Sequence, residues 1–215
     1  MSDQPPVVAA RKYLAIVSET ETYLDRYGDT YRGVGWTRTQ QDVDQRYAVA
    51  LDVVRTTGPV SLLDFGCGAS HLLEFIERTG RQDVIYSGLD LSPRFLELSR
   101  RKFPGVTYYD IDVLQTPDAL PMFDYVLLNG VFQSRGPLSF EEMLTYAETL
   151  IEVLFAKARH GLAFNVMSKH VDWERDDLFH LPLDTLAAFL VRRVTRNFII
   201  RHDYGQYEYT TYVYR

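Results

Sequence analysis

The segment Val60–Ser70 constrains the fold of this chain more than any other part of the sequence. Its first six residues are mostly apolar, β-branched or aromatic, which is typical of a buried strand in a parallel sheet. Gly66 and Gly68 follow, and glycine lets the backbone turn tightly and come close to a ligand. A helix that begins at Ala69 would direct its unpaired amide groups at that ligand. The pattern therefore predicts a strand, a turn and a helix around a nucleotide-type cofactor.

The glycine spacing separates two classes of cofactor loop. The dinucleotide fingerprint G-x-G-x-x-G requires a third glycine, so that helix and strand pack closely around a pyrophosphate. This chain has His71 at that position, which disfavours an NAD-dependent oxidoreductase. The loop is closer to D-x-G-x-G-x-G/S, with Asp64 as its acid and Ser70 as its last residue. On this motif the chain resembles the class I S-adenosylmethionine-dependent methyltransferases, from about residue 62 to its end.

Strand and helix patterns alternate after residue 60. Strands are predicted at 60–65, 84–89, 106–110, 123–129 and 161–167, and helices at about 69–79, 93–103, 139–159 and 183–193. This alternation predicts an α/β fold with a doubly wound, mostly parallel sheet. Two further predicted strands, 195–203 and 207–214, are joined by a short turn and must therefore pair antiparallel. The resemblance implies a seven-stranded Rossmann-like methyltransferase sheet, with the turn of this C-terminal hairpin at the ligand-binding edge.

Residues 1–58 precede the sheet and are predicted to form an N-terminal helical cap or lid. Apolar residues recur at helical spacing over about 7–27 and 39–56, with a glycine-rich loop between the two stretches. Residues 59–215 are predicted to form the Rossmann-like core. A chain of 215 residues fits one α/β domain, so the cap and the core are expected to belong to a single domain.

Charge and composition limit the partners. A net charge of −6 and a pI near 5.4 argue against a large basic surface for nucleic acid. No apolar run approaches the ~20 residues of a membrane span, and the N-terminus lacks the pattern of a signal peptide, so we expect a cytoplasmic protein. A single cysteine, Cys67, excludes an intrachain disulfide and a Cys-rich metal site. We expect a small-molecule acceptor and no metal.

The strand ends carry the first group of predicted cofactor contacts. Asp90 ends the second strand, where an acidic side chain can accept hydrogen bonds from both ribose hydroxyls of a nucleoside. Leu91 would then border the adenine. Asp112 follows the third strand and is expected to accept a hydrogen bond from the adenine amino group, with Val113 contributing an amide and an apolar contact. Asp110 is the less favoured alternative, because it falls out of register with the motif.

Five further residues complete the predicted cofactor site. Asp64 is expected to hold the glycine loop by accepting backbone or cofactor-amine hydrogen bonds. Cys67 is interpreted as a small residue beside the cofactor. The resemblance implies that Asn129, after the fourth strand, faces the transferred methyl group, and that Arg46, on a helix before the first strand, binds the cofactor carboxylate. Trp36 is expected either to cover the cofactor as a lid or to anchor its own loop.

Residues near the ligand edge are the candidates for the acceptor side. A base is needed only where the acceptor is a poorly ionised hydroxyl, and imidazole is the natural base near pH 7. His170 follows the fifth strand and His202 precedes the hairpin turn, so these two are the candidate bases. A hydrogen-bonded structural imidazole is the alternative for both. The predicted acceptor contacts are Tyr31, Phe132, Ser168 and Tyr204.

The combined hypothesis is a bacterial S-adenosylmethionine-dependent methyltransferase that methylates an oxygen or nitrogen of a small molecule and releases S-adenosylhomocysteine. The segments 27–29, 33–36, 201–204 and 207–210 resemble a group of small bacterial methyltransferases to which we attach no substrate. Asn129 and Gly130 depart from N-P-P-Y/F, the motif of amino methyltransferases that act on nucleobases and glutamine, which disfavours a base-modifying enzyme. The alternatives are a non-catalytic protein that binds S-adenosylmethionine and, less favoured, an NAD-dependent oxidoreductase.

Overall fold

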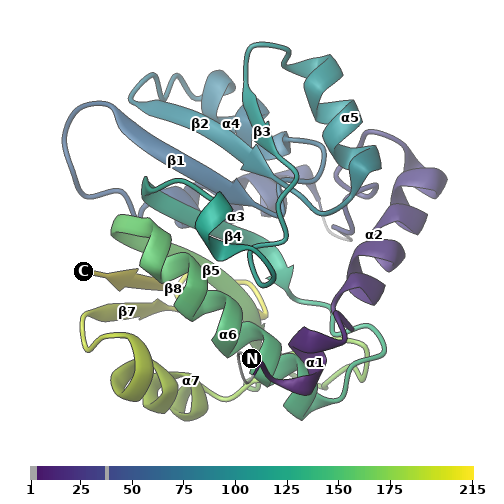
Figure 1. Cartoon of the computed structure of the whole chain (residues 1–215), viewed down its shortest axis with the longest axis vertical. Helices are drawn as coiled ribbons and strands as arrows, with labels where there is room; N and C mark the ends of the chain where they lie inside the picture. The colour runs from purple at the N-terminus through teal and green to yellow at the C-terminus, as the bar shows by residue number, and fades with distance from the viewer. Residues whose placement is uncertain (1–3, 37–38) are drawn as a thin grey trace.

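The computed structural model describes residues 4–36 and 39–215, which form one sheet with helices on both faces (Figure 1). The strands are β1 (Val60–Phe65), β2 (Val84–Leu89), β3 (Thr107–Tyr109), β4 (Phe123–Phe132), β5 (Ala158–Ser168), β6 (His180–Leu181), β7 (Phe198–Arg201) and β8 (Glu208–Tyr214). The α-helices are α1 (Pro6–Ala9), α2 (Leu14–Tyr27), α3 (Gln40–Leu51), α4 (His71–Arg78), α5 (Pro93–Lys102), α6 (Phe140–Lys157) and α7 (Leu183–Phe189). A short 3₁₀ turn, η1 (Pro117–Ala119), and a π-helical turn, η2 (Leu190–Val194), complete the elements of the described chain.

The strand order is β3-β2-β1-β4-β5-β8-β7, and β6 pairs with the end of β5. The pairings among β1 to β5 are parallel, whereas β8 runs antiparallel to both β5 and β7. This confirms the predicted doubly wound, mostly parallel sheet with an antiparallel C-terminal hairpin. The predicted count of seven strands omitted β6, because its two residues are too few to leave an alternating pattern in the sequence.

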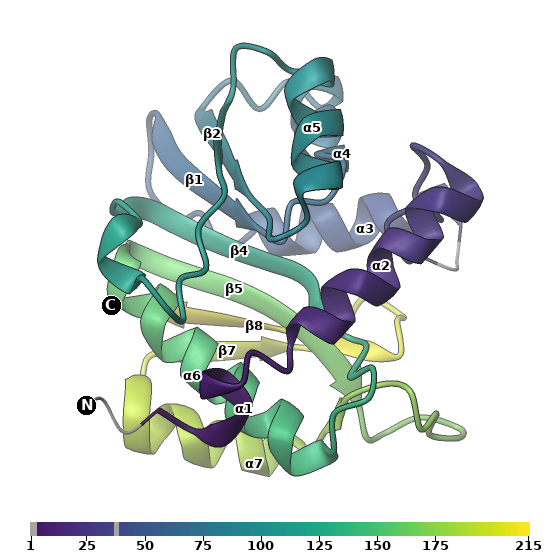
Figure 2. The same cartoon turned by 45° about the vertical axis from the view of Figure 1, so that its right-hand side comes forward.

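The core consists of two apolar layers, one on each face of the sheet. Successive strand residues point to opposite faces, so Leu63 packs with α6 and α7 in one layer while its neighbour Leu62 packs with α3 and α4 in the other. Figure 2 shows α1, α6 and α7 on one side of the sheet and α3 and α4 on the other. Both layers leave the carboxyl ends of the parallel strands free for a ligand.

The N-terminal segment lies over that carboxyl edge. The predicted helix over 7–27 is broken into α1 and α2 at Arg11, which has a left-handed φ of 50° that ends a regular helix. Helix α2 then runs across the ends of the strands (Figure 2), and no residue within Leu14–Tyr27 is fully buried. None of the helices that the structure describes combines the length and the apolarity needed to cross a membrane.

The C-terminal hairpin turn lies at the same edge. Glu208, the first residue of β8, pairs with Met167 near the end of β5. Residues 202–207, which connect β7 to β8, therefore lie beside the carboxyl ends of the parallel strands, as predicted. The glycine loop, the N-terminal cap and this turn surround one region of the molecule.

Candidate functional site

A cavity of about 430 Å³ lies at the carboxyl edge of the sheet, a volume within the usual range for small-molecule sites. Its walls come from the ends of β1, β2, β4 and β5, from α2 and α3, and from the segment that follows β5. The lining residues include Asp64, Gly66, Cys67, Gly68, Asp90, Leu91, Asn129, Arg46 and Trp36. The structure therefore brings most of the predicted cofactor residues to one cavity, and α2 covers it.

The glycine loop is shaped by three residues with a left-handed backbone. Gly66 and Gly68 have φ of 73° and 51°, and Ser70 has φ of 58°. A Cβ atom at Gly66 would lie 2.7 Å from the side chain of Val131, so this position has no room for a larger residue. Ser70 tolerates its strained backbone because its hydroxyl is held by the side chains of Ser99 and Tyr108, each at 2.9 Å.

Asp90 fixes the loop from the neighbouring strand. One carboxylate oxygen accepts a hydrogen bond from the Gly68 amide and the other from the Ser92 amide, each at 2.8 Å. Burial raises the pKa of Asp90, and the amides of Ser92 and Gly68 oppose that rise. Each oxygen keeps a second lone pair for a further donor, and Asp90 lines the cavity. Its predicted contact with ribose hydroxyls stays a prediction.

Asp64 occupies the end of β1 and is 4% exposed. The Tyr86 hydroxyl donates to its carboxylate at 2.8 Å, and burial raises the pKa of Asp64 to about 7. The backbone hydrogen bonds expected for Asp64 are not among the described contacts. The loop amides of Gly66 and Cys67 instead donate to the carbonyl of Leu89. The loop is thus held by β2, and Asp64 faces the cavity with a tyrosine as its donor.

Two polar side-chain atoms on the cavity wall are buried and lack a partner within the described residues. These are the amide nitrogen Nδ2 of Asn129 and the ring nitrogen Nδ1 of His71. Nearly all buried polar atoms in native proteins are hydrogen-bonded, so such atoms on a cavity wall indicate a ligand or a water as the missing partner. The other ring nitrogen of His71 is 2.9 Å from Asp29.

Arg46 is engaged by a buried ion pair that the sequence did not predict. Its Nε donates to Glu208 at 2.9 Å and its Nη2 donates to Gln206 at 3.2 Å. The guanidinium also lies over the ring of Trp36, at 4.6 Å from its centroid. Trp36 in turn packs against Gly130 at the end of β4. Trp36 and Arg46 both line the cavity. The predicted contact of Arg46 with a cofactor carboxylate stays a prediction.

Glu208 connects this pair to the strands. It also accepts hydrogen bonds from Asn165 at 2.9 Å and from Gln133, and Asn165 accepts one from the Gly130 amide at 2.7 Å. Sequence reasoning missed Glu208, Gln133 and Asn165. The one available signal was the charge of Glu208 at the start of an otherwise uncharged strand, since buried charges are rare unless paired.

Two predicted adenine contacts do not line the cavity within the described residues. The carboxylate of Asp112 accepts a hydrogen bond from the Tyr13 hydroxyl at 2.7 Å and pairs with Arg11 at 2.8 Å. Val113 is 1% exposed and packs in the core. The sequence did not show that the α1–α2 junction would pack on the end of β3 and engage this carboxylate. Leu91, in contrast, lies on the wall as predicted.

The structure places the two candidate bases outside the described cavity wall. His170 is exposed, and the ring of His202 packs against Tyr209, which points to the opposite face of β8 from Glu208. His71 and His180 line the cavity instead. His180 donates from Nδ1 to the Ser168 carbonyl at 2.7 Å and accepts at Nε2 from a backbone amide, so both of its nitrogens are engaged.

The four predicted acceptor contacts are also absent from the wall that the structure describes. Phe132 is fully buried between Tyr146 and Phe164 in the core. Ser168 is buried and accepts a hydrogen bond from a backbone amide, and the Tyr204 hydroxyl bonds to Thr210. Tyr31 packs against the layer formed with α3 and α4. Phe132 and Ser168 are taken up by strands because β4 and β5 continue to residues 132 and 168, beyond the predicted ends at 129 and 167.

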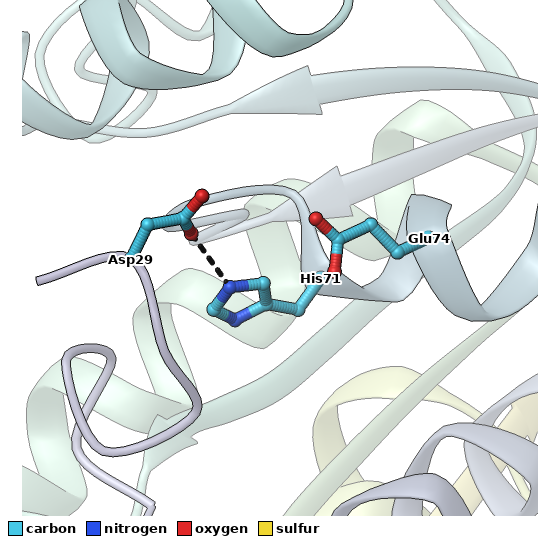
Figure 3. Close-up of side chains that lie close together, drawn as sticks. All are labelled: Asp29, His71 and Glu74. Atoms are coloured by element: carbon cyan, nitrogen blue, oxygen red, sulfur yellow. Dashed lines mark hydrogen bonds and ion pairs between the residues drawn. The ribbon is translucent and has the colours of Figure 1, made fainter.

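Figure 3 shows Asp29, His71 and Glu74 close together beside the loop, an arrangement that resembles a metal site. The ammonium of Lys102 lies 2.6 Å from Glu74 and 3.0 Å from Asp29, and it donates to the Ala69 carbonyl at 2.9 Å. A protein cation therefore already pairs with both of these acids. The cluster connects the cap to α4 and α5.

These features fit an adenosylated amino acid. The glycine loop provides a cradle that a Cβ at Gly66 would fill, Asp90 lies at the adjacent strand end, and the free amide of Asn129 faces the same cavity. The cavity wall therefore contains the donor and acceptor set that the cofactor implied by the resemblance requires.

Comparisons with known proteins agree with this assignment. The family described as "Methyltransferase domain" matches residues 63–154. A protein of Mycobacterium tuberculosis with a methyltransferase name is 29% identical over 163 residues, which are 75% of this chain and 96% of that protein. The magnesium protoporphyrin IX methyltransferase of Synechocystis, solved with S-adenosylhomocysteine, has a TM-score of 0.62 at 16% identity over 96% of this chain and 98% of its own. The N-methyltransferase NodS of Bradyrhizobium japonicum has a TM-score of 0.62 at 15% identity, and the match covers 91% of this chain and 98% of NodS.

Proposed function

Because this chain is a class I S-adenosylmethionine-dependent methyltransferase, we propose that it methylates an oxygen or nitrogen atom of a small-molecule acceptor. The observation that carries this proposal is the continuity of the cavity. The space that begins at the glycine loop extends to Met167 near the end of β5 and to Tyr207 before β8. A cofactor and a second small molecule can therefore lie in one covered cavity, as a direct transfer requires.

We assign the cofactor to the half of the cavity around β1 and β2. Gly66 and Gly68 allow close approach, and Asp90 has lone pairs left for ribose hydroxyls. Asn129 would donate its unpartnered amide near the reacting end. Arg46 retains Nη1 for a carboxylate, since Nε and Nη2 contact Glu208 and Gln206.

Transfer requires positioning more than side-chain chemistry. When bound, S-adenosylmethionine would supply an activated methyl group on a cationic sulfur. The residues of the chain align the acceptor with that methyl group and exclude bulk water, and alignment alone can supply much of the rate. We assign no histidine base, because both nitrogens of the cavity-lining His180 are engaged within the described structure, and His71 lies beside the glycine loop in the cofactor half, with Nε2 2.9 Å from Asp29.

We propose that residues 1–58 act as a cap on the core formed by 59–215. The inner face of α2 contributes Ile16, Val17, Thr20 and Tyr23 to the cavity wall. Its outer contacts are polar, Glu21 with Ser92 and Asp25 with Arg94, and Asp29 just after the helix contacts His71 and Lys102. Leu14 and Ile16 also pack against the core, but no residue of α2 is fully buried, so we expect this helix to open for ligand exchange.

Calorimetric titration with S-adenosylmethionine, S-adenosylhomocysteine and NAD tests the cofactor, and release of S-adenosylhomocysteine with an acceptor library tests the reaction. We expect micromolar binding of the first two ligands and turnover with a small molecule. Binding without turnover on any acceptor would support the non-catalytic alternative. Binding of NAD alone would contradict the proposal.

A further inference from the structure

The far half of the cavity differs from the cofactor half in its side chains. It is lined by the end of β4, by Met167 of β5 and by the segment 171–180. This segment is fixed to the end of β4, because the Phe179 amide donates to the Gln133 carbonyl at 2.7 Å and the Arg135 amide donates to the Asp177 carbonyl at 3.1 Å. These backbone hydrogen bonds hold the wall opposite the cofactor in place.

Charges on this wall do not favour an anionic acceptor. Among the described residues that line this end, the arginine is Arg175, which forms two hydrogen bonds with Asp177, whereas Arg46 belongs to the cofactor half. The acids Asp172 and Asp177 lie at this end. A carboxylate or phosphate placed here would lose hydration and meet no unpaired lysine or arginine in residues 4–36 and 39–215.

Aromatic side chains surround the same end. Trp173 and Tyr207 line the cavity and yet are 72% and 44% exposed, which is unusual for large aromatic residues. Tyr23 adds a third ring from α2. The Tyr207 hydroxyl donates to Asp172 at 3.1 Å, so the hairpin turn and the segment after β5 present their rings together. Val171 and Leu178 supply apolar contacts between them.

We propose that the acceptor is a planar, uncharged ring compound that carries the methylated hydroxyl or amine and stacks against Trp173. Flat aromatic faces bind flat rings through buried area and favourable ring geometry. The proposal rests on the proposed methyltransferase function and narrows its acceptor class. It excludes polycarboxylates and phosphorylated metabolites.

Four probes separate shape from charge in calorimetric titrations of the protein, with and without saturating S-adenosylhomocysteine. The first, 2-naphthol, is planar and uncharged; decahydro-2-naphthol has the same skeleton without planarity; 2-naphthoate is planar and anionic; citrate is a flexible polyanion. We expect 2-naphthol to bind several-fold to about tenfold more tightly than each of the others. Equal or tighter binding of the anions or of the saturated alcohol, or no binding of 2-naphthol, would overturn the proposal.

Variants of Trp173 test where 2-naphthol binds. Trp173→Ala should lower the affinity for 2-naphthol at least severalfold, Trp173→Phe should restore most of it, and both should bind S-adenosylhomocysteine like the wild type. Tyr27→Ala is the matched control, because Tyr27 is an exposed aromatic residue outside the cavity wall. Unchanged affinity for 2-naphthol in Trp173→Ala would also contradict the proposal. If the wild type does not bind S-adenosylhomocysteine, the proposed function is refuted. The titrations made without S-adenosylhomocysteine still decide the acceptor class.

Discussion

Arg46 and Glu208 are 162 positions apart in the sequence, and their side chains form an ion pair of 2.9 Å that is 8% and 1% exposed. The pair joins α3 of the cap region to the first residue of β8, next to the cavity. Because both charges are buried, neither can be removed without leaving the other unpaired.

Glu208→Gln should lower the free energy of unfolding by about 3–5 kcal/mol, the usual cost of removing one partner of a buried ion pair. Urea denaturation measures this loss. The double variant Arg46→Met/Glu208→Gln should recover part of it, since no buried charge then remains. Glu97→Gln, which breaks an exposed pair with Arg101, is the control and should leave the midpoint unchanged. A Glu208→Gln protein as stable as the wild type would show that the pair does not hold α3 to β8.

Asp90→Ala should weaken S-adenosylhomocysteine binding by about 1.5–3 kcal/mol, the range for hydrogen bonds to a charged group. Calorimetric titration gives the affinity, and circular dichroism verifies the fold. Asp110→Ala serves as control, because Asp110 is an exposed acid directly after β3 and does not line the described cavity. Equal affinities for the two variants would remove Asp90 from the cofactor site.

Stability should depend on pH through Asp64. The folded protein keeps a proton on Asp64 up to about pH 7, whereas the unfolded chain releases it near its ordinary pKa of 3.8. Between these values the unfolded state binds fewer protons, so this residue makes the free energy of unfolding fall as pH rises, by up to about 1.4 kcal/mol per unit. Above pH 7 the contribution levels off.

Urea denaturation from pH 4.5 to pH 8 compares the wild type with Asp64→Asn. We expect the wild type to lose more stability than the variant over this interval, and Asp110→Asn to follow the wild type. Parallel curves for the wild type and Asp64→Asn would contradict a raised pKa for Asp64.

Gly66→Ala and Gly80→Ala form a matched pair. The two glycines have φ of 73° and 71°, but a Cβ at Gly66 would lie 2.7 Å from Val131, whereas a Cβ at Gly80 would meet nothing within 4 Å. Backbone strain alone should cost Gly80→Ala about 1–2 kcal/mol. Gly66→Ala should cost clearly more and should lose S-adenosylhomocysteine binding. If the variants were equally stable and both bound the ligand, the glycine loop would not need its close packing.

The sequence predicted the elements with local signals and missed those that depend on tertiary contacts. β1 and β2 were predicted with their observed ends, because each is a short apolar run bounded by glycine or aspartate. The break between α1 and α2 was missed, since nothing local at Arg11 predicts a positive φ. The glycine loop was found because its conformation depends on residues adjacent in sequence.

The acceptor side of the site could not be predicted for the same reason. His202 and Tyr207 lie in one short turn, yet of these two only Tyr207 lines the described cavity, because His202 packs on Tyr209 whereas the Tyr207 hydroxyl donates to Asp172 of the cavity wall. The network around Glu208 joins Gln133, Asn165 and Arg46 from three separate elements. No spacing in the sequence records such a network, because its members meet only when the sheet and the cap have formed.

Helix α2 is attached to the core by ion pairs that reach solvent: Asp25 and Arg94 are 62% and 45% exposed. Salt screens such pairs, and at 1 M ionic strength the Debye length falls to about 3 Å. The residence time of a molecule beneath α2 should therefore shorten as ionic strength rises, with the equilibrium stability of the sheet little changed. The rate at which this protein exchanges its ligands would then respond to the ionic composition of its surroundings.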